Sequence, residues 1–561
     1  MCSTSNTLAD VSRLLGLGID VGTTNTKVAL VAAPESAADG TVELLAVAAA
    51  PTPEPAALDR VLRELTVRAL ATARRSAGGA PTAGAWPGPA LVPQAVGVAS
   101  MAETGVPLDA GGRPLDPWLR WDGRRAAAEA AALADRLGAT ALFEATGVRP
   151  SAKVPLATLA WLAAHDPGRR AALARWAGVA DLAALRLTGD LVTDHTLAGR
   201  SMAYRLPPAG AGLPTAFDAD LLADVGLRPE HLPRVAGPGA VAGAVRPGAW
   251  VAAGLRAGTP VVVAGHDHAV GAWAAGVRAP GTTADSIGTA EAVCTVLSAD
   301  PVRADVARAG MSLVRTVAGL PALLAGSSSA GAMVRWWLEH EAAGWTADDL
   351  FAAAAALPPP DRPDPADPAA PLVLPYVSGR QTPEPDPAAG VRVLHRAAHG
   401  PVVLAAAMLE GLALQARWML DVQLRLGAAA DPALRPERLV VLGGPASRNT
   451  AWMRAKAEAG PVPVRLVDCA EPVAAGAALL ALHRAGLLDP DDPPVLPALD
   501  GLPDGRPLPA PRPGTDAALA RFVRAARAAA APDDAARAAP DHTARAAAPD
   551  DPPYPISGGH P

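Results

Sequence analysis

The first residues that could do chemistry in this sequence are an aspartate and the polar turn that follows it. Asp20 ends a short apolar run, and Gly22, Thr23, Thr24 and Lys27 come directly after it. Glycine lets a backbone approach an anion closely, and turn N–H groups and threonine hydroxyls donate hydrogen bonds to phosphate oxygens. An aspartate at a strand end can hold Mg²⁺ directly or through water. The pattern is not a Walker A loop, so it indicates either another kind of phosphate-binding turn or an ordinary hairpin with a polar tip.

A second Gly-Thr turn, Gly288-Thr289, lies between two apolar runs in the second half of the chain. This turn offers the same backbone N–H donors as the first. If the fold brings the two turns face to face, they could bind a polyphosphate from both sides. Further on, a strand over residues 439–442 ends in Gly443 and Gly444. A base or a ribose could pack against such exposed backbone, although paired glycines are also common in ordinary turns.

The candidate for acid–base chemistry is Asp267, which ends an apolar strand over residues 261–267 and lies between His266 and His268. An acid at the C-terminal end of a strand lies at the mouth of an α/β cleft, where it could accept a proton from a substrate hydroxyl. The His-Asp-His run also offers three metal ligands. Residues on an extended strand alternate faces, so we expect both histidines to point away from Asp267, which disfavours a transition-metal site. Asp267 could also cap the following helix, a role compatible with catalysis.

Two further groups of side chains suit a polyhydroxylated ligand. Met101 and Glu103 follow a buried-looking strand over residues 95–99, and Trp121 and Asp122 follow soon after. Carboxylates bind hydroxyl groups, and an indole offers an apolar face with one N–H donor. On their own, these residues are better explained as surface charge and a core tryptophan.

Strands and helices that alternate along the chain must position these residues, and this alternation predicts an α/β fold. A strand–turn–strand unit with a Gly-Thr tip occurs once in each half, which fits a duplicated domain rather than a solenoid. The segment 509–561 is rich in Ala, Pro, Asp and Arg, and we predict that most of it is disordered, with at most one short helix. The expected strands cover residues 14–19, 27–32, 95–99, 261–267, 282–287, 292–297, 439–442 and 464–467, and the expected helices cover 58–71, 269–275, 402–424, 452–459 and 473–487.

The composition excludes several broad classes of protein. The 561 residues carry 49 Lys plus Arg against 55 Asp plus Glu, and a net charge of −6 argues against a general nucleic-acid binder. The longest apolar stretch, residues 402–420, is interrupted by polar and charged residues, so no membrane-spanning helix is expected. The N-terminus lacks the features of a signal peptide, and three separated cysteines form no disulfide framework. We therefore predict a cytoplasmic protein without membrane or nucleic-acid partners.

Lysine is rare in this chain. It occurs only at Lys27, Lys153 and Lys456, while arginine supplies the other basic side chains. Codon bias would explain the preference, but a retained lysine also supplies a compact point charge that arginine does not.

Taken in order, these motifs resemble those of the FGGY carbohydrate kinases, which share a fold superfamily with actin, hexokinase and the heat-shock chaperone ATPases. The resemblance covers residues 14–488. Residues 18–27 resemble the first phosphate motif of the family, 286–289 the second, and 442–446 with 471–478 the adenosine motif and its closing helix; further matches lie at 187–189, 193–194, 375–379 and 410–413.

The resemblance implies two ribonuclease-H-like, actin-like ATPase domains, over residues 14–258 and 259–488, with the active site in the cleft between them. Asp267 matches the catalytic base and Asp20 the acid that helps to hold Mg²⁺, so these two carboxylates are the expected metal ligands. The implied chemistry is transfer of the γ-phosphoryl group of ATP to a small-molecule sugar or polyol, and a homodimer is a possible assembly. The expected nucleotide-binding residues are Asp20, Gly22, Thr23, Thr24, Lys27, Gly288, Thr289, Gly443, Gly444 and Asn449.

The sequence departs from the family pattern mainly at the residues that would contact the sugar. Glu103 and Thr104 resemble a pair in glycerol kinases, but Ala102 replaces the arginine of that group, and xylulose kinases carry Gln-Met-His here. The residue after the catalytic aspartate is Asn or Gln in both groups, whereas this chain has His268. We therefore expect a pocket distinct from both groups that accepts a ketose, a sugar acid or a polyol. The expected substrate-binding residues are Met101, Glu103, Trp121, Asp122 and His268.

Two other functions remain possible from the sequence. The alternative is a non-catalytic regulator of the same fold that binds sugar and nucleotide, although loss of function would be expected to show first at Asp20 or Asp267, and both are present. A chaperone-like or filament-forming ATPase is disfavoured by the sugar-kinase motifs between residues 187 and 376.

Overall fold

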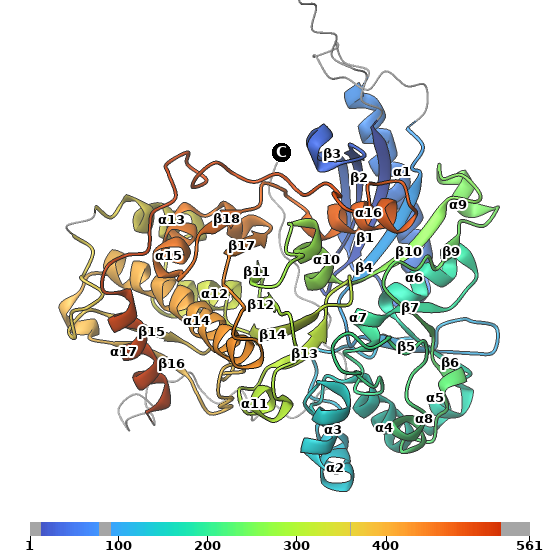
Figure 1. Ribbon diagram of the computed structural model, residues 1–561, viewed down its shortest axis with the longest axis horizontal. Helices are drawn as coiled ribbons and strands as arrows, with labels where there is room; N and C mark the ends of the chain where they lie inside the picture. The colour runs from blue at the N-terminus through green and yellow to red at the C-terminus, as the bar shows by residue number, and fades with distance from the viewer. Residues whose placement is uncertain (1–12, 78–90, 359–360, 529–561) are drawn as a thin grey trace, which may run out of the picture.

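The computed structural model describes residues 13–77, 91–358 and 361–528. Two six-stranded mixed sheets form the centres of the two halves of the molecule (Figure 1). Helices cover both sheets, which confirms the predicted α/β class. Residues 1–12, on which the expectation about a signal peptide rests, lie outside the described residues.

The first sheet has the strand order β3-β2-β1-β4-β10-β9. Strands β1, β4 and β10 run parallel to one another, whereas β2 is antiparallel to β1. The strands are nearly all apolar because helices pack on both faces of the sheet, and this explains why they read as continuous apolar runs. The strands are β1 (Leu14–Val21), β2 (Asn25–Ala33), β3 (Glu43–Pro51), β4 (Ala95–Ser100), β9 (Gly243–Ala244) and β10 (Pro260–His266).

The second sheet repeats this arrangement. Its order is β13-β14-β12-β11-β17-β18, in which β11, β17 and β18 are parallel and β12 is antiparallel to β11. Each sheet thus contains an antiparallel hairpin followed by parallel strands, as expected for a duplicated domain. The strands are β11 (Thr282–Ile287), β12 (Glu291–Val296), β13 (Ser312–Arg315), β14 (Pro321–Ser327), β17 (Arg438–Gly443) and β18 (Val464–Leu466).

The expected boundary between residues 258 and 259 falls one strand too early. Strand β10 pairs with β4, so it belongs to the first sheet and not to the second. The sequence hides this pairing because the partner strands are separated by more than half of the first domain. The change of sheet lies after β10 and the helix α10 (Asp267–Ala274) that follows it.

A helix from the end of the second half, α16 (Pro472–Arg484), packs against the first sheet (Figure 1). Two strand glycines permit this close approach. A Cβ atom on Gly18 would lie 1.7 Å from the carbonyl oxygen of Ala474, and one on Gly97 would lie 1.9 Å from that of Ala477. Helix α16 also contacts α10, so the two halves share a continuous apolar core at this point.

The segment between β4 and β9 forms a mainly helical part that carries several of the predicted sugar-binding residues. It extends from the first sheet at the lower right of Figure 1. Its elements are β5 (Gly105–Leu108), α2 (Ala127–Leu137), α3 (Ala139–Thr146), α4 (Pro155–His165), α5 (Pro167–Ala172), β6 (Arg175–Gly178), α6 (Val179–Thr188), β7 (Val192–Asp194), α7 (His195–Ala198), α8 (Ala219–Ala223) and β8 (Arg234–Ala236).

Helix α14 (Pro401–Ala430) is the longest in the described part of the chain and the main helix of the second core. By length and composition it could cross a membrane, with a mean hydropathy of 1.3, but 78% of its most apolar window is buried inside the protein. An apolar helix that is buried in this way is a core helix. Other helices are α1 (Leu58–Ala77), α9 (Ala249–Ala252), α11 (Arg303–Arg308), α12 (Gly331–His340), α13 (Ala347–Ala356) and α15 (Thr450–Ala459); β15 (Leu372–Pro375) pairs with β16 (Val391–Leu394).

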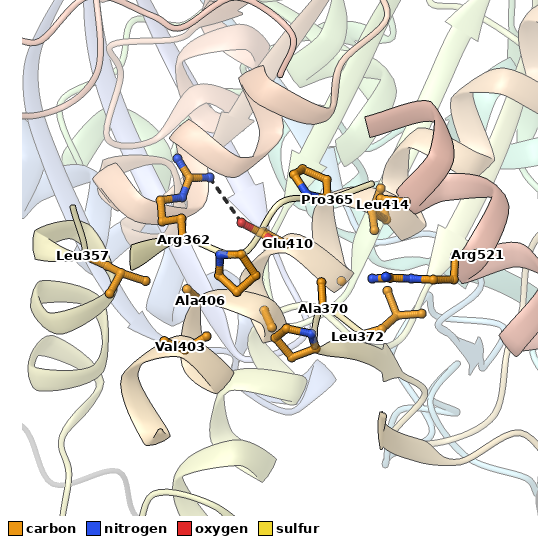
Figure 2. Close-up of a pocket in the computed structure, with 15 residues that line it drawn as sticks. Leu357, Arg362, Pro365, Ala370, Leu372, Val403, Ala406, Glu410, Leu414 and Arg521 are labelled. Carbon is orange, nitrogen blue, oxygen red and sulfur yellow. Dashed lines mark hydrogen bonds and ion pairs between the residues drawn. The ribbon is translucent and has the colours of Figure 1, made fainter. Parts of the chain in front are cut away.

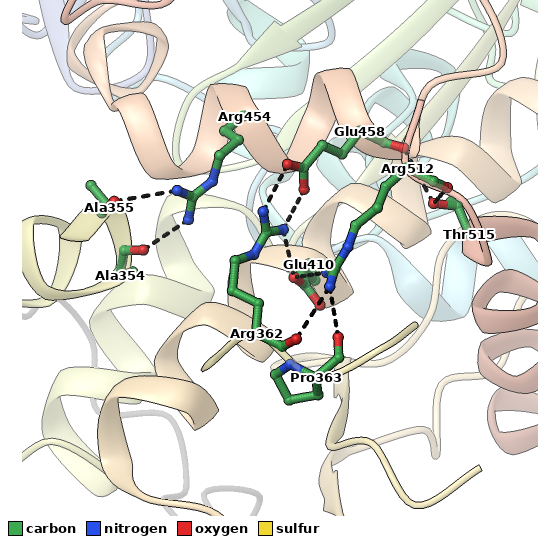
Figure 3. Close-up of polar contacts among 9 residues, drawn as sticks. All are labelled: Ala354, Ala355, Arg362, Pro363, Glu410, Arg454, Glu458, Arg512 and Thr515. Carbon is green, nitrogen blue, oxygen red and sulfur yellow. Dashed lines mark hydrogen bonds and ion pairs between the residues drawn. The ribbon is translucent and has the colours of Figure 1, made fainter. Parts of the chain in front are cut away.

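The one short helix expected in the segment 509–561 is present as α17 (Thr515–Arg527). Residues 529–561, on which most of the predicted disorder rests, lie outside the described residues. The entry to α17 is held by a polar cluster, shown in Figure 3, in which Arg362 binds Glu458 and Glu410. Arg512 lies 3.5 Å from Glu410 and donates a 2.9 Å hydrogen bond to the carbonyl of Pro363. Glu410, part of a stretch that resembles the family, thus has a structural role.

We predict that Phe522→Ala lowers the thermal midpoint of unfolding, because Phe522 is fully buried and packs edge-on against the rings of Tyr376 and Trp418. Removal of a buried phenylalanine ring costs about 3–5 kcal/mol. Arg524→Ala, on the exposed side of α17, is the control and should leave the midpoint unchanged. Calorimetric melting checks this, and equal midpoints for the two variants would show that α17 contributes nothing to the core.

Candidate active site

Asp20 and Asp267, the two predicted Mg²⁺ ligands, lie at the same edge of the first sheet. In the register of the parallel strands, Val21 pairs with Ser100, and Ser100 pairs with His266. Asp20 precedes the first of these residues and Asp267 follows the last, so the carboxyl ends of β1 and β10 bring both aspartates to one edge. This is the edge at which α/β proteins bind ligands.

Asp20 is buried, and its surroundings disfavour the charged form of its carboxyl group. Burial is the main cause that raises the pKa of its carboxyl to about 7, and the nearby Asp267 and Glu471 raise it further, while Lys27 lowers it. The Oδ1 atom of Asp20 is buried without a hydrogen-bond donor. A buried carboxylate oxygen that lacks a donor, close to a second carboxylate, suits a hard divalent cation.

The first Gly-Thr turn is closed by its own backbone, with a 3.0 Å hydrogen bond from the Gly22 N–H to the carbonyl of Asn25. Thr24 at its tip is exposed, and its carbonyl accepts a 2.9 Å hydrogen bond from the N–H of Thr52. Lys27 lies opposite Asp20 in the hairpin register and forms a 2.5 Å ion pair with Glu471, the residue that precedes α16. Lys27 therefore links the predicted phosphate-binding turn to α16, the helix that joins the two halves.

The structure corrects the expected geometry around Asp267. The strand ends at His266 and Asp267 is the first residue of α10, so the alternation of faces stops there. The Oδ1 atom of Asp267 lies 3.1 Å from Nε2 of His266 and 3.8 Å from Nε2 of His268. The three side chains therefore converge, with candidate ligand atoms within 4.8 Å of one another. Burial lowers the pKa of His266 to about 4, so its ring is neutral near pH 7.

Asp267 is also not the helix cap. The cap position of α10 is His266, whose side chain makes no capping hydrogen bond. The Oδ1 atom of Asp267 accepts a 2.6 Å hydrogen bond from the N–H of His268, and about a quarter of the Asp267 side chain remains exposed. The carboxylate is thus oriented by the helix start and still open to a ligand.

The predicted sugar-binding residues divide into two groups. Trp121 lies at the site, because its Nε1 donates a 2.9 Å hydrogen bond to Oγ1 of Thr23, which in turn contacts Sδ of Met101. Asp122 is exposed, and no hydrogen bond or ion pair of its side chain is found in the described part of the chain. Its nearness in sequence to Trp121 does not bring it into the same set of contacts.

Glu103 makes a contact that the sequence does not indicate. It has a left-handed backbone with φ of 69°, which is uncommon for a residue other than glycine. Its Oε1 atom accepts a 2.7 Å hydrogen bond from Nη2 of Arg200, which follows α7 almost a hundred residues later. Arg200 and His266 line the same pocket between the two halves, together with Thr196 and Thr316.

A second unpredicted group holds the backbone just before Asp267, the predicted base. Asp194 accepts hydrogen bonds from Oγ1 of Thr196 at 2.6 Å and from Arg484 at 2.9 Å. Thr196 in turn accepts a 2.9 Å hydrogen bond from the N–H of His266. Burial opposes ionisation of Asp194, but His195 and Arg484 outweigh it and lower its pKa to about 2. The only sequence signal was the match of residues 193–194 to the family.

The second Gly-Thr turn and the paired glycines lie on adjacent strands of the second sheet. Ile287 pairs with Gly443 in the register of β11 and β17, and a Cβ atom on Gly443 would lie 2.5 Å from the carbonyl oxygen of Ile287. Gly288 and Thr289 follow directly and are exposed. Gly443 and Gly444 are followed by Asn449, whose Oδ1 accepts a 3.0 Å hydrogen bond from the N–H of Trp452. Asn449 therefore caps α15, which accounts for one of its polar atoms.

A separate pocket, of about 440 Å³, contains none of the predicted site residues. It lies beside α14 and α17 and is lined by Arg362, Glu410, Arg521 and apolar side chains (Figure 2). The polar cluster at the entry to α17 forms part of its wall, so its charged groups already have structural partners.

Comparison with known proteins agrees with this arrangement. The models of the FGGY family of carbohydrate kinases match residues 15–274 with the N-terminal domain and 283–485 with the C-terminal domain. The chain is 34% identical over 410 residues to a xylulose kinase of Streptomyces coelicolor, which covers 71% of this chain and 75% of the relative. It is 27% identical over 403 residues to an L-fuculokinase of Escherichia coli K12, with 70% and 77% covered.

The structural comparison extends over almost the whole described chain. The crystal structure of a xylulose kinase from Rhodospirillum rubrum superposes with a TM-score of 0.73 at 26% identity, covering 91% of this chain and 97% of that one. This confirms the predicted two-domain, actin-like fold. The end of the first family match, after β10 and α10, agrees with the corrected position of the boundary. The chain therefore belongs to the FGGY family of carbohydrate kinases and is a phosphotransferase.

Proposed function

We propose that this enzyme transfers the γ-phosphoryl group of ATP to a hydroxyl group of a sugar, sugar acid or polyol, with Asp267 as the general base. The observation that carries this proposal is the meeting of Asp20 and Asp267 at the same edge of the first sheet, at the carboxyl ends of the parallel strands β1 and β10 on either side of β4, beside a glycine-containing turn. The exposed turn at Gly288 and Thr289, next to Gly443 and Gly444, supports nucleotide binding on the second sheet.

The proposed reaction is a direct displacement. Asp267 accepts the proton of the substrate hydroxyl, whose oxygen attacks the γ-phosphorus of ATP. The new O–P bond forms as the bond from the γ-phosphorus to the β–γ bridging oxygen breaks, and ADP leaves with that electron pair. The proton then passes from Asp267 to solvent. The hydrogen bond from the N–H of His268 keeps the carboxylate oriented throughout.

The residues present fit a bound Mg²⁺ ion. Asp20 offers a buried oxygen without a donor, and Asp267 supplies a second carboxylate nearby. When bound, Mg²⁺ supplies positive charge that offsets the charge of the polyphosphate. Asp20 then holds the ion, and Lys27 and its partner Glu471 fix the turn beside it.

We also propose a cytoplasmic location. Cys294 and Cys469 are free thiols, and burial raises the pKa of Cys294 to about 12, so this thiol stays protonated and unreactive. A reducing compartment keeps such thiols free.

The test is release of ADP by the purified protein with Mg²⁺ and ATP. We expect at least one compound to stimulate release well above the rate with ATP alone, in a panel of pentuloses, hexuloses, polyols, glycerol and sugar acids. ATP binding without stimulation by any compound would instead support a non-catalytic regulator.

A further inference from the structure

Three cationic side chains, Arg149, Lys153 and Arg200, lie together beside the candidate active site, and we refer to them as the cationic cluster. Arg149 and Lys153 belong to the segment between α3 and α4, and Arg200 follows α7. All three side chains are partly buried, and 14% of the Arg200 side chain is exposed. Burial is the main cause that lowers the pKa of Lys153, and the charges of Arg200 and Arg149 lower it further, so both arginines lie close enough to act on Lys153.

The cationic cluster has too few acceptors for its charge. Glu103 pairs with Nη2 of Arg200, but the Nε and Nη1 atoms of Arg200 are buried without an acceptor. Within the described residues, no carboxylate forms an ion pair with Arg149 or Lys153, and Nζ of Lys153 lies 5.0 Å from the centre of the Trp121 ring. Asp122 and Glu103 act on Lys153 only at longer range. Buried donors without acceptors are costly, so an anionic ligand would supply what this part of the protein lacks.

The position of the cationic cluster relates it to the sugar. Arg200 lines the pocket between the two halves together with His266, the residue before the proposed base. Trp121, beneath Lys153, donates a hydrogen bond to Thr23 in the first phosphate turn. A molecule that presents a hydroxyl group to Asp267 would therefore have the cationic cluster within reach of another part of its structure.

We propose that the sugar substrate carries an anionic group, a carboxylate or a phosphate, and that Arg149, Lys153 and Arg200 bind this group. This proposal rests on the proposed kinase activity and names its substrate class. The guanidinium of Arg200 has free N–H groups at Nε and Nη1 that can each donate to an anionic oxygen, and Lys153 adds a compact charge. A neutral ketose or polyol would leave these donors unsatisfied.

The test is a calorimetric measurement of binding to the wild-type protein with a non-hydrolysable ATP analogue. The first arm compares aldonates, such as gluconate, galactonate and xylonate, with their own amides, which differ only by the charge. The second arm compares ketose phosphates with the free ketoses. We expect one anionic compound to bind at least about tenfold more tightly than its neutral partner, as for hydrogen bonds to charged groups. The arm that contains it identifies the anionic group.

Variants then assign the effect to the cationic cluster. Arg149→Met and Lys153→Met should each weaken binding of the anionic compound by roughly tenfold or more and change binding of its neutral partner little. Lys153→Arg keeps the charge and should preserve most of the preference, which separates loss of charge from loss of fold. Arg74→Met, which removes an exposed charge from α1, is the matched control and should change nothing.

Equal or tighter binding of neutral compounds, or binding of no anionic compound at all, would overturn this proposal. Equal losses for anionic and neutral compounds in Lys153→Met would also overturn it. A neutral ketose that is phosphorylated efficiently would leave the kinase activity intact and refute only the substrate class. The two proposals therefore fail in distinguishable ways.

Discussion

Asp267→Asn is expected to lower kcat by roughly 10²–10⁴-fold, the usual contribution of a general base. The amide has nearly the same shape as the carboxylate and can still accept the 2.6 Å hydrogen bond from the N–H of His268, so α10 should begin as before. It cannot accept a proton from the substrate hydroxyl at neutral pH. The loss should therefore appear in the chemical step, while ATP binding on the second sheet is retained.

The measurement is ADP release at saturating ATP with the compound that stimulates the wild-type enzyme most. A parallel titration of nucleotide binding checks that the second sheet still binds ATP. Asp135→Asn, at an exposed position on α2, is the matched control and should keep the wild-type kcat. If Asp267→Asn retained kcat within about threefold, Asp267 would not be the base, whatever the geometry at its strand end.

The sequence predicted the elements that carry the site because each motif is local. The β1–β2 hairpin and the β11 strand were recognised from an apolar run, a Gly-Thr turn and a second apolar run, and their observed bounds differ from the prediction by a few residues at most. These patterns depend on neighbouring residues, which the sequence displays directly.

The sequence does not predict those contacts of the site that join distant segments of the chain. Glu103 contacts Arg200, and Asp194 contacts Arg484 across almost three hundred residues, with no local pattern to mark either pair. The predicted arrangement of side chains around His266 and Asp267 is also wrong. One residue decides whether the chain continues as a strand or turns into a helix, and the sequence does not mark that residue. Because the chain turns into a helix at Asp267, both histidine side chains lie beside the Asp267 carboxylate instead of on the opposite face.

Lys456 illustrates the same limit. The sequence marks it only as one of three lysines, but in the structure it is fully buried on α15, where its Nζ atom contacts Asp285 at 2.5 Å and also Glu291. Burial is the main cause that raises the pKa of Glu291 above its usual range, and the nearby Asp285 raises it further, while Lys456 lowers it. Lys456 is thus the counter-charge of two buried acidic side chains. Asp285 and Glu291 lie on the two strands that carry the exposed turn at Gly288 and Thr289.

We predict that Lys456→Met destabilises the protein severely, by roughly 3–5 kcal/mol, because it leaves the Asp285 carboxylate buried without a counter-charge. Urea unfolding followed by circular dichroism measures this as a lower midpoint. Arg425→Met, an exposed position on the neighbouring α14, removes the same charge and should change the midpoint little.

The double variant Lys456→Met with Asp285→Asn provides the decisive comparison. If the cost of Lys456→Met comes from an uncompensated charge, removal of that charge should restore much of the lost stability, so the two changes would be strongly non-additive. If the cost comes only from lost packing, the double variant would be no more stable than the single one. Helix α15, which carries Lys456, begins at the cap residue Asn449 beyond Gly443 and Gly444. The contacts of Lys456 with Asp285 and Glu291 therefore connect the paired glycines to the turn at Gly288 and Thr289, the two predicted nucleotide-binding elements of the second sheet. We therefore expect both the single and the double variant to have a raised KM for ATP, since the lysine no longer holds the turn at Gly288 and Thr289 against α15. The double variant should recover stability without lowering that KM.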